Sequence, residues 1–391
     1  MDQPMFNKSA QIRVLFAHQS TIPHYRIPFY EMLERLRPES WGFDVVFDLA
    51  ELENPQFFHE PINIEEFGFP LLNVKTLTLQ IRGKKISYQT FWRRAADYDL
   101  LIVGHSINNL AYPFCQVHQL VGNKFAYWGH GWDHAVNHNQ MSLPKKIIEN
   151  LKLLLARQAD GFFAYTPGVK DYLVQEGLSP QRVFVVNNTI DINEQRRLLE
   201  HWLPQRRLIR QQLNLHAKKT LLFVGRFTQN KRIDFLLKAL TILQSWEPDY
   251  HLLLVGSGGE ANSIDALPNV TYLGPIVEPN QLAKIYVASD LFSFPGSVGL
   301  GPLQALCYDL PVVTIESNIQ MPEFEYLNNN NSIILPLLTT PEIYARAIFE
   351  LFDDQEKLRA LRSGVWPSIK HRSIEKMALN FIHGIDSILA T

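Results

Sequence analysis

The stretch LLFVGRFTQNK, residues 221–231, decides how the second half of this chain folds. Its first four residues are apolar and predict a buried parallel strand. The residues after it repeat apolar side chains at helical spacing: Ile233, Leu236, Leu237, Leu240 and Leu243. A glycine turn therefore joins a strand end to a helix start and carries two cations, Arg226 and Lys231. Backbone N–H groups, a helix dipole and fixed positive charge suit a diphosphate. A solvated loop with ordinary surface charges is the alternative for this stretch alone.

A second glycine turn of the same kind lies downstream. Residues 290–295 predict a strand, residues 296–302 (GSVGLGP) form the turn, and residues 303–308 predict the start of a helix. Three glycines and a proline beside a helix N-terminus can also hold an anion. Residues 309–314 then predict a turn and another buried strand. Two turns of this type in one α/β half favour a phosphate-binding function over a chance pattern.

The order of these motifs resembles the C-terminal half of family 4 glycosyltransferases, which are retaining enzymes of the GT-B fold. It runs from Gly225-Arg226 and Lys231 through VGSG at 255–258 and TYLGP at 271–275 to the Gly299 turn and PVV at 311–313. The resemblance is strong over residues 220–330 and weaker, though consistent in layout, over 11–195. It implies an α/β protein of the GT-B fold, with two Rossmann-like doubly wound domains facing a central cleft.

The length of 391 residues predicts two domains rather than one. We expect residues 1–195 to form an N-terminal, acceptor-binding Rossmann-like domain and residues 196–372 a C-terminal, nucleotide-sugar-binding one. The resemblance implies that residues 373–391 form a helix that packs back on the N-terminal domain. Residues 192–219 are polar, basic and helix-prone, which is typical of an interdomain connection. Short apolar strands that alternate with helices indicate parallel sheets.

Composition indicates a soluble enzyme. The chain is 46% hydrophobic and 19% charged, and its net charge of −2 is not that of a nucleic-acid binder. Cys115 and Cys307 lie far apart in apolar surroundings and predict buried free thiols. Residues 1–10 lack the apolar core of a signal peptide, and no run reaches the length of a membrane span. We therefore expect a cytoplasmic protein, either free or at the inner face of the cell membrane.

The resemblance places the sugar nucleotide on the C-terminal domain. It implies that Arg226 and Lys231 hold the diphosphate and stabilise charge on the leaving group, so that no metal or other cofactor is expected. The single Asp-x-Asp, Asp97 to Asp99, precedes a predicted strand and is typical of surface carboxylates. We expect the donor also to contact a further set of residues: Gly225, Gly256, Gly274, Pro275, Ile276, Ser297, Val298, Gly299, Leu300 and Gln304.

This chain departs from the family at two positions around the second turn. Most members carry two glutamates eight positions apart, one for sugar hydroxyls and one for the ribose. Gly296 and Gln304 stand at or near these positions. The amide of Gln304 can still bond ribose hydroxyls, and the N–H of Gly296 or Ser297 can replace the first acid. The variant turn resembles a subset that acts in surface-polysaccharide assembly. The missing acid leaves the donor sugar open, and also leaves open an inactive member.

Several histidines in the first half of the chain are candidate site residues. His130 lies in YWGHGW, residues 127–132, directly after a predicted strand, and flanking glycines expose it. In the family a histidine after this strand lies near the reacting sugar, so the resemblance implies a catalytic role for His130. The alternative is a histidine that caps a turn. Other residues expected to contact the acceptor or line the cleft are His18, His24, Arg26, Asp133 and Glu323.

A basic, apolar segment, residues 144–157, predicts an amphipathic helix that begins with a proline. Four basic residues are interspersed among its apolar ones: Lys145, Lys146, Lys152 and Arg157. Peripheral membrane contact would suit an enzyme with a lipid-linked acceptor. A solvated basic face on a helix that packs on the core is an equal alternative.

The resemblance implies hexosyl or deoxyhexosyl transfer, with retention, from a nucleotide-diphosphate sugar to a glycan or polyprenyl-linked acceptor. The variant turn indicates bacterial surface-polysaccharide assembly. Two alternatives remain at this point: an epimerase of GT-B type that converts the free nucleotide sugar, and a non-catalytic sugar-binding subunit. The cations Arg226 and Lys231 speak against the non-catalytic alternative, and Gly296 keeps it open.

Overall fold

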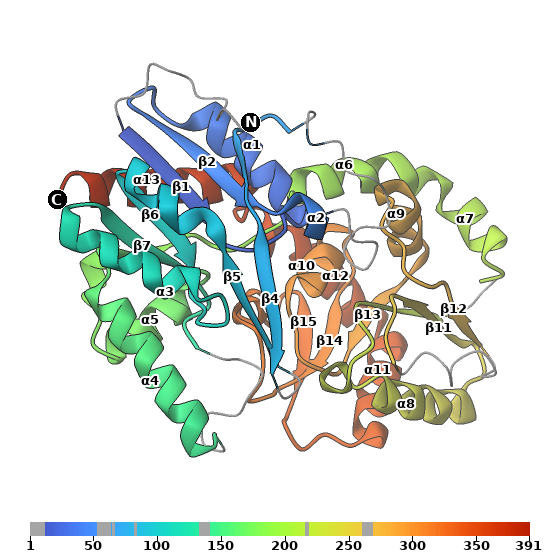
Figure 1. Ribbon diagram of the computed structural model, residues 1–391. Coiled ribbons are helices and arrows are strands. Elements are labelled where there is room, and N and C mark those ends of the chain that lie inside the picture. The colour runs from blue at the N-terminus through green and yellow to red at the C-terminus, as the bar shows by residue number, and fades with distance from the viewer. Residues whose placement is uncertain are drawn as a thin grey trace. The chain divides into compact units, whose positions relative to one another are not determined.

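The computed structural model describes residues 12–52, 64, 67–81, 84–132, 141–215, 219–259 and 269–391 (Figure 1). The chain divides into two compact units. Within the described residues, unit 1 comprises the chain up to residue 132, residues 141–190 and Ile374–Thr391, and unit 2 comprises Asp191–Ser373. Each unit is built around its own parallel sheet, which agrees with the prediction of two doubly wound halves.

In unit 1 the described residues form a seven-stranded parallel sheet in the order β3-β2-β1-β6-β7-β8-β9. The central strands are buried runs of apolar residues, as expected for a sheet covered on both faces. The strands are β1 (Ile12–Ala17), β2 (Trp41–Phe47), β3 (Leu71–Asn73), β6 (Leu100–Gly104), β7 (Lys124–Gly129), β8 (Gly161–Ala164) and β9 (Val183–Val185). An antiparallel hairpin, β4 (Thr76–Ile81) and β5 (Lys84–Gln89), stands apart from this sheet.

The helices of unit 1 are α1 (Ile27–Leu36), α2 (Leu49–Leu52), α3 (Ala111–Cys115), α4 (Leu143–Gln158), α5 (Pro167–Gln175) and α13 (Ile374–Leu389). Short 3-10 helices are η1 (His24–Arg26), η3 (Thr90–Asp97), η4 (Gln116–Val121) and η6 (Pro180–Arg182). The last helix, α13, packs against α1 in the core of unit 1. Its Phe381 ring lies 4.6 Å from that of Phe163 and 4.8 Å from that of Trp128, between ring centroids.

In unit 2 the described residues form a six-stranded parallel sheet in the order β12-β11-β10-β13-β14-β15. The strands are β10 (Lys219–Val224), β11 (Tyr250–Val255), β12 (Val270–Tyr272), β13 (Leu291–Phe294), β14 (Val312–Ile315) and β15 (Ser332–Leu335). The helices are α6 (Ile192–Trp202), α7 (Arg206–Gln212), α8 (Ile233–Trp246), α9 (Pro279–Ala288), α10 (Leu300–Cys307), α11 (Pro341–Asp353) and α12 (Gln355–Ile369), with η7 (Leu203–Gln205), η8 (Gln229–Lys231) and η10 (Pro322–Tyr326).

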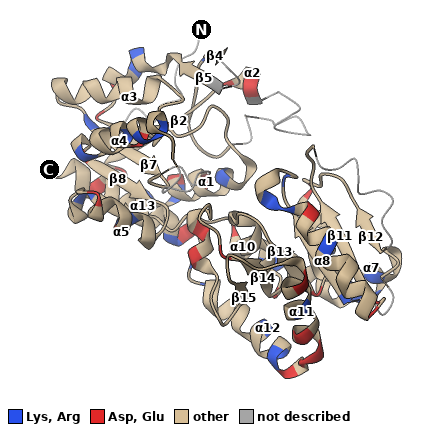
Figure 2. Ribbon diagram, turned by 90° about the horizontal axis from the view of Figure 1, so that it is seen from below, with Lys and Arg blue, Asp and Glu red and all other residues tan. Residues whose placement is uncertain are grey.

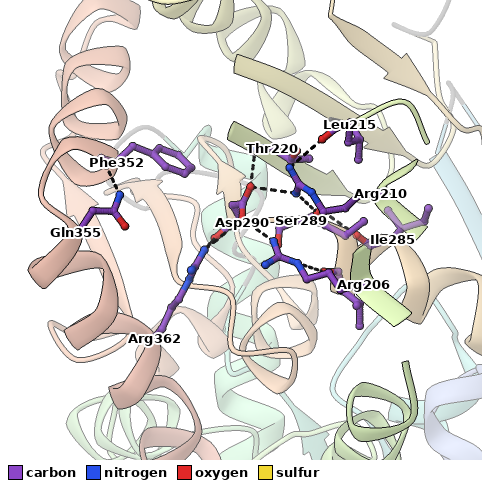
Figure 3. Close-up of polar contacts among 12 residues, drawn as sticks. Arg206, Arg210, Leu215, Thr220, Ile285, Ser289, Asp290, Phe352, Gln355 and Arg362 are labelled. Carbon is purple, nitrogen blue, oxygen red and sulfur yellow. Dashed lines mark hydrogen bonds and ion pairs between the residues drawn. The ribbon is translucent and has the colours of Figure 1, made fainter. Parts of the chain in front are cut away.

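Asp290, just before β13, ties three elements of unit 2 together (Figure 3). Its carboxylate lies 2.6 Å from Arg206 and 3.3 Å from Arg210 on α7, and 3.4 Å from Arg362 on α12. It also accepts a hydrogen bond from the N–H of Thr220. The helix-prone segment expected to connect the domains, residues 192–219, carries α6 and α7, and the arginines of α7 pair with this carboxylate at the start of β13 in unit 2.

One predicted boundary was wrong. The helix expected to start at Leu303 begins at Leu300, so that Pro302 falls in its first turn, where a missing N–H costs no helix bond. Cys115 and Cys307 are free and buried, as predicted. Among the helices of the described residues, none has the length and apolar character of a membrane span.

Candidate functional site

The loops that follow β10, β11 and β12 lie side by side at the carboxyl edge of the unit 2 sheet. The N–H of Gly225 donates to the carbonyl of Val255, and that of Gly256 donates to the carbonyl of Gly274. Gly256 has a positive φ of 138°, and a Cβ there would overlap the carbonyl oxygen of Gly225. Only glycine permits this close approach. The structure thus brings together three glycines that the sequence assigned to the donor site, and Pro275 and Ile276 continue from the third.

Lys231 ends η8 and lies half-buried between the two glycine turns. Its Nζ donates to the carbonyl oxygen of Ser297 and lies 5.3 Å from the centroid of the Phe294 ring. Burial lowers the pKa of Lys231 to about 8, with a smaller contribution from the Arg226 guanidinium, while the charge of Glu323 acts in the opposite direction. Arg226 itself is exposed on the turn. One fixed and one accessible cation therefore occupy this edge of the sheet.

Gly296 lies against the backbone of the first turn. A Cβ at this position would come within 2.5 Å of both Cα and the carbonyl carbon of Lys231, and closer still to the carbonyl oxygen of Asn230. The N–H of Ser297 donates to that same oxygen over 2.8 Å. The absence of an acid at position 296 therefore has a steric reason: the two turns touch, and no side chain fits between them.

The two residues that follow Gly296 are buried and make hydrogen bonds within the protein. Ser297 is buried, and its hydroxyl donates to the carbonyl of Ile319 over 2.6 Å. The side chain of Val298 is fully buried, and its N–H donates to Oε1 of Gln320. These side chains are therefore not available to a ligand. The N–H of Ser297, which was expected to replace the missing acid, is also engaged, because it donates to the carbonyl of Asn230. Gly299 then caps α10, whose first residue is Leu300.

Two further predicted residues of unit 2 have internal partners. The Gln304 amide, expected to bond a ribose, donates to Oε1 of Gln195 on α6 over 3.2 Å. Glu323 on η10 is buried, with an exposed fraction of 5%, and its charge acts on Lys231. Sequence reasoning missed Asn230, Gln195 and Gln320. No local pattern marks these residues, because their roles depend on partners far along the chain.

Unit 1 gathers polar rings at the carboxyl edge of its own sheet, the edge at which open α/β sheets bind ligands. His18, His105, His130 and Tyr165 directly follow β1, β6, β7 and β8 in turn. They line a cavity of about 620 Å³ together with Lys145, Glu149 and Lys152 of α4. The structure therefore places His18 and His130 in one pocket.

A buried hydrogen-bond chain lies beside this pocket. Nη2 of Arg26 donates to the hydroxyl of Tyr165 over 3.2 Å, and that hydroxyl lies 3.2 Å from Nε2 of His18. The His18 ring stacks on Trp128 with a centroid distance of 3.9 Å, and the Arg26 guanidinium lies over the same indole at 4.6 Å. Arg26 is 1% exposed. Its guanidinium is therefore neither a surface charge nor a direct ligand contact. It supports the pocket by holding Tyr165 and Trp128, which line the cavity.

Two of the pocket histidines are neutral. Burial, followed by the charges of Arg26 and His130, holds the pKa of His18 well below its ordinary value. Burial, followed by the charge of Lys152, does the same to the pKa of His105. Lys152 is paired in turn with Glu149, whose two carboxylate oxygens each lie 3.0 Å from its Nζ. Neutral imidazoles can donate or accept hydrogen bonds, so the pocket suits a ligand with hydroxyl groups.

His130 is half-buried, and its contacts agree with both interpretations that the sequence left open, a turn cap and a residue of the site. Its Nδ1 lies 3.2 Å from the carbonyl oxygen of Trp132, so that it caps the turn. Its ring also lines the cavity and meets Tyr165 edge-on at 5.5 Å between centroids. His24 is exposed on η1 and is not among the residues that line this cavity. Asp133, also expected near this site, lies outside the described residues.

His105 and Glu149 were not singled out from the sequence, and Lys152 was noted only as one of the basic residues of an amphipathic helix. His105 had a usable signal, because it follows the apolar run at 100–104 directly, as His18 follows β1. Glu149 and Lys152 had none, since charges on an amphipathic helix are normally exposed.

The Asp97 to Asp99 motif lies at the opposite, amino end of β6. Asp99 accepts a hydrogen bond from the N–H of Arg13 over 2.7 Å, and Asp97 lies 3.7 Å from Arg94. Both carboxylates therefore have roles in the local structure, as their position before the strand indicated. In the part of the chain that the structure describes, no group of three or more His, Cys, Asp or Glu side chains could hold a metal ion.

Part of the chain is similar in sequence to glycosyltransferases. Residues 218–354 match the model of the family described as "Glycosyl transferases group 1". An uncharacterized glycosyltransferase of Haemophilus influenzae is 27% identical over 42% of this chain and 49% of its own length. A D-inositol 3-phosphate glycosyltransferase of Rhodococcus jostii is 28% identical over 52% of this chain and 47% of its own length. The chain thus spans about half the length of the curated relatives it matches.

Among solved structures, HepE of Anabaena in complex with UDP superimposes with a TM-score of 0.70. The alignment covers 96% of this chain and 100% of that one, at 16% identity. At this identity the likeness establishes the fold. Both units are Rossmann-like, and the fold is GT-B, as the sequence predicted.

Proposed function

We propose that this protein is a retaining, metal-independent glycosyltransferase of the family 4 type. It moves a hexosyl or deoxyhexosyl group from a nucleotide-diphosphate sugar to a glycan or lipid-linked acceptor, in the assembly of a bacterial surface polysaccharide. The observation that carries the proposal is the position of Lys231, a cation held between two touching glycine turns within the segment that matches glycosyl transferases group 1.

The proposed reaction uses unit 2 for the donor and the pocket of unit 1 for the acceptor. The bond between the anomeric carbon and the diphosphate breaks, and the acceptor hydroxyl forms the new glycosidic bond and gives its proton to an oxygen of the departing diphosphate. Arg226 and Lys231 stabilise the negative charge that grows on the departing diphosphate, which is the role a metal ion has in other transferases. His130 and His18 offer hydrogen bonds to sugar or acceptor hydroxyls.

The match to a transferase family supports transfer over the epimerase alternative, and the intact cation pair supports an active enzyme over a binding subunit. Retention and the polysaccharide role depend on the resemblance of the turns at 225–231 and 296–302. HepE, whose solved complex contains UDP, supports a nucleotide diphosphate as the donor's leaving group.

The test is release of the nucleotide diphosphate from a panel of sugar nucleotides, with and without candidate acceptors, in excess chelator. We expect release that depends on acceptor and persists in chelator, and a product with the donor's anomeric configuration by NMR. Arg226→Ala and Lys231→Ala should each lower the rate by roughly 100-fold or more. Normal turnover in both variants would contradict the donor site, and activity rescued only by Mg²⁺ or Mn²⁺ would contradict metal independence.

A further inference from the structure

Helix α4 has apolar residues on two faces: Leu153 and Ala156 are buried in the core, and a second apolar stripe is exposed. Its buried positions include Glu149 and Lys152, which are 7% and 8% exposed. Its outer face presents four large apolar side chains: Leu143, Ile147, Leu151 and Leu154 are 73%, 60%, 45% and 51% exposed. A helix on the surface of a water-soluble domain normally turns its apolar stripe to the core and its charges to solvent. The second, exposed apolar stripe indicates that this outer face meets something other than water.

The neighbouring segment extends the same apolar surface. The side-chain amides of Gln116 and Gln119 on η4 donate to the carbonyls of Leu155 and Gln158, so that η4 lies against the end of α4. Figures 1 and 2 also show α3 beside α4, and the ribbon of α3 carries no charged residue in Figure 2. Five more apolar residues are exposed here: Leu110, Phe114, Val117, Leu120 and Val121. We call these five, together with the four of α4, the apolar face.

The charges around the apolar face are mainly basic. Within residues 110–121 and 143–158, Glu149 is the single carboxylate, and it is paired with buried Lys152. Lys145 and Lys146 form no ion pair within the described part of the chain, whereas Arg157 lies 3.9 Å from Glu176. The uncompensated charge of these segments is therefore positive. A second copy of this face would bring more lysines and no free acid, so charge complementarity favours an anionic surface over self-association.

The same helix lines the pocket of unit 1. Lys145, Ile148, Glu149 and Lys152 contribute to the cavity of about 620 Å³, while the leucines one turn away belong to the apolar face. A molecule anchored in a bilayer under the apolar face would have its polar end beside this pocket.

We infer that the apolar face inserts into the interface of an anionic lipid bilayer, and that the acceptor is accordingly lipid-linked. The second clause rests on the proposed function, and the first does not. Apolar side chains of α3, η4 and α4 would enter the acyl boundary, while Lys145 and Lys146 contact lipid phosphates.

The test uses the full chain and sedimentation with large vesicles, made either of phosphatidylcholine alone or with about a third phosphatidylglycerol. We expect binding to the anionic vesicles, and at least tenfold weaker binding to the neutral ones or in high salt. Ile147→Glu and Leu154→Glu should each weaken binding at least tenfold. Their matched control is Leu208→Glu on α7, because Leu208 is 52% exposed and belongs to unit 2. Lys146→Glu should weaken binding to anionic vesicles only.

Equal binding by the apolar-face variants and the Leu208→Glu control would overturn the inference. So would a concentration-dependent dimer, seen by light scattering, that Ile147→Glu disperses. Circular dichroism melts confirm that the variants fold, which is expected because the altered side chains are exposed. Vesicle binding needs no sugar nucleotide, so it can succeed where transfer fails.

A second experiment tests the lipid-linked acceptor. Leu154→Glu should retain transfer to a water-soluble acceptor and lose transfer to the same group on a vesicle-borne lipid. Equal loss of both would overturn the lipid-linked acceptor.

Discussion

The hydroxyl oxygen of Tyr165 lies 3.2 Å from Nε2 of His18, and it also receives a hydrogen bond from Arg26. A guanidinium can only donate, so that the Tyr165 oxygen is an acceptor on that side. We predict that the single proton of the hydroxyl is directed at Nε2 of His18, whose pKa is lowered by burial and by the charge of Arg26. The remaining imidazole proton would lie on Nδ1, and His18 would present a hydrogen-bond donor rather than a base.

Tyr165→Phe removes the hydroxyl that holds His18 in one tautomer, so both tautomers should be populated in the variant. We expect ¹⁵N NMR of the ring nitrogens to show the Nδ1–H form in the unaltered protein and a mixture in the variant. His18→Asn, whose amide imitates Nδ1, should retain more activity than His18→Gln, whose amide imitates Nε2. A dominant Nε2–H signal in the unaltered protein would contradict the assignment, whatever the activities are.

Lys231 should set an alkaline limit on nucleotide binding. Its pKa of about 8, lowered chiefly by burial, means that the ammonium is charged below that pH and loses its proton above it. The affinity for a nucleoside diphosphate should then fall up to about tenfold for each pH unit above 8. Lys231→Arg stays charged throughout this range and should abolish the pH dependence, even if it binds more weakly. Calorimetric titrations between about pH 7 and pH 9 would show it, and an unchanged fall in the Arg variant would assign the titration to another group.

Gly296→Ala should disrupt the turn at 229–231, which we propose binds the diphosphate. The added Cβ would come within 2.5 Å of the Lys231 backbone, so that the turn at 229–231 must shift. We expect at least tenfold weaker binding of the nucleotide diphosphate and a comparable loss of turnover. Gly301→Ala is the matched control, because its Cβ would make only an ordinary contact, 3.5 Å from the carbonyl oxygen of Val224. Equal behaviour of the two variants would mean that the close approach of the turns has no functional role.

His130→Ala should lower turnover by at least tenfold and leave the affinity for nucleotide diphosphate nearly unchanged. The reason is that His130 lines the pocket of unit 1, whereas the cation pair belongs to unit 2. Because Nδ1 also meets the Trp132 carbonyl, thermal melts must accompany the kinetics. His130→Asn can keep a turn hydrogen bond without the imidazole. If it restored both melting temperature and turnover, turn capping alone would explain the residue.

Asp290→Asn should destabilise unit 2 without touching either proposed site. Three arginines would lose their shared carboxylate, and breaking a buried ion pair costs about 3–5 kcal/mol. Because Arg206 and Arg362 are 33% and 34% exposed, we expect a smaller loss of unfolding free energy, about 2–3 kcal/mol. Asp234→Asn is the control, since Asp234 forms an exposed pair with Lys238 at 4.0 Å. Similar urea midpoints for the two variants would show that the cluster around Asp290 contributes little to the unfolding free energy.

Local pattern was enough to predict the elements of this fold. The strand, turn and helix predicted at 221–243 match β10, η8 and α8 closely, because an apolar run and helical spacing are properties of neighbouring residues. The glycine turns were also readable, since glycine tolerates the close backbone approaches that such turns require. The start of α10 was misplaced because a proline in a first turn resembles a helix boundary.

The sequence by itself determined that strands end in His18, His130 and the Lys231 turn, and hence which residue types stand at the carboxyl edges. Only the tertiary structure decided that Gly296 touches Lys231, that Arg26 is buried behind Tyr165, and that Gln304 binds Gln195. These pairs are remote in sequence, so no local spacing encodes them. Helix α4 shows the same limit most plainly. Its periodicity shows which side chains share a face, but which face is buried depends on the elements packed against it. Here Glu149 and Lys152 are buried together with Leu153, and Ile147 and Leu154 are left exposed.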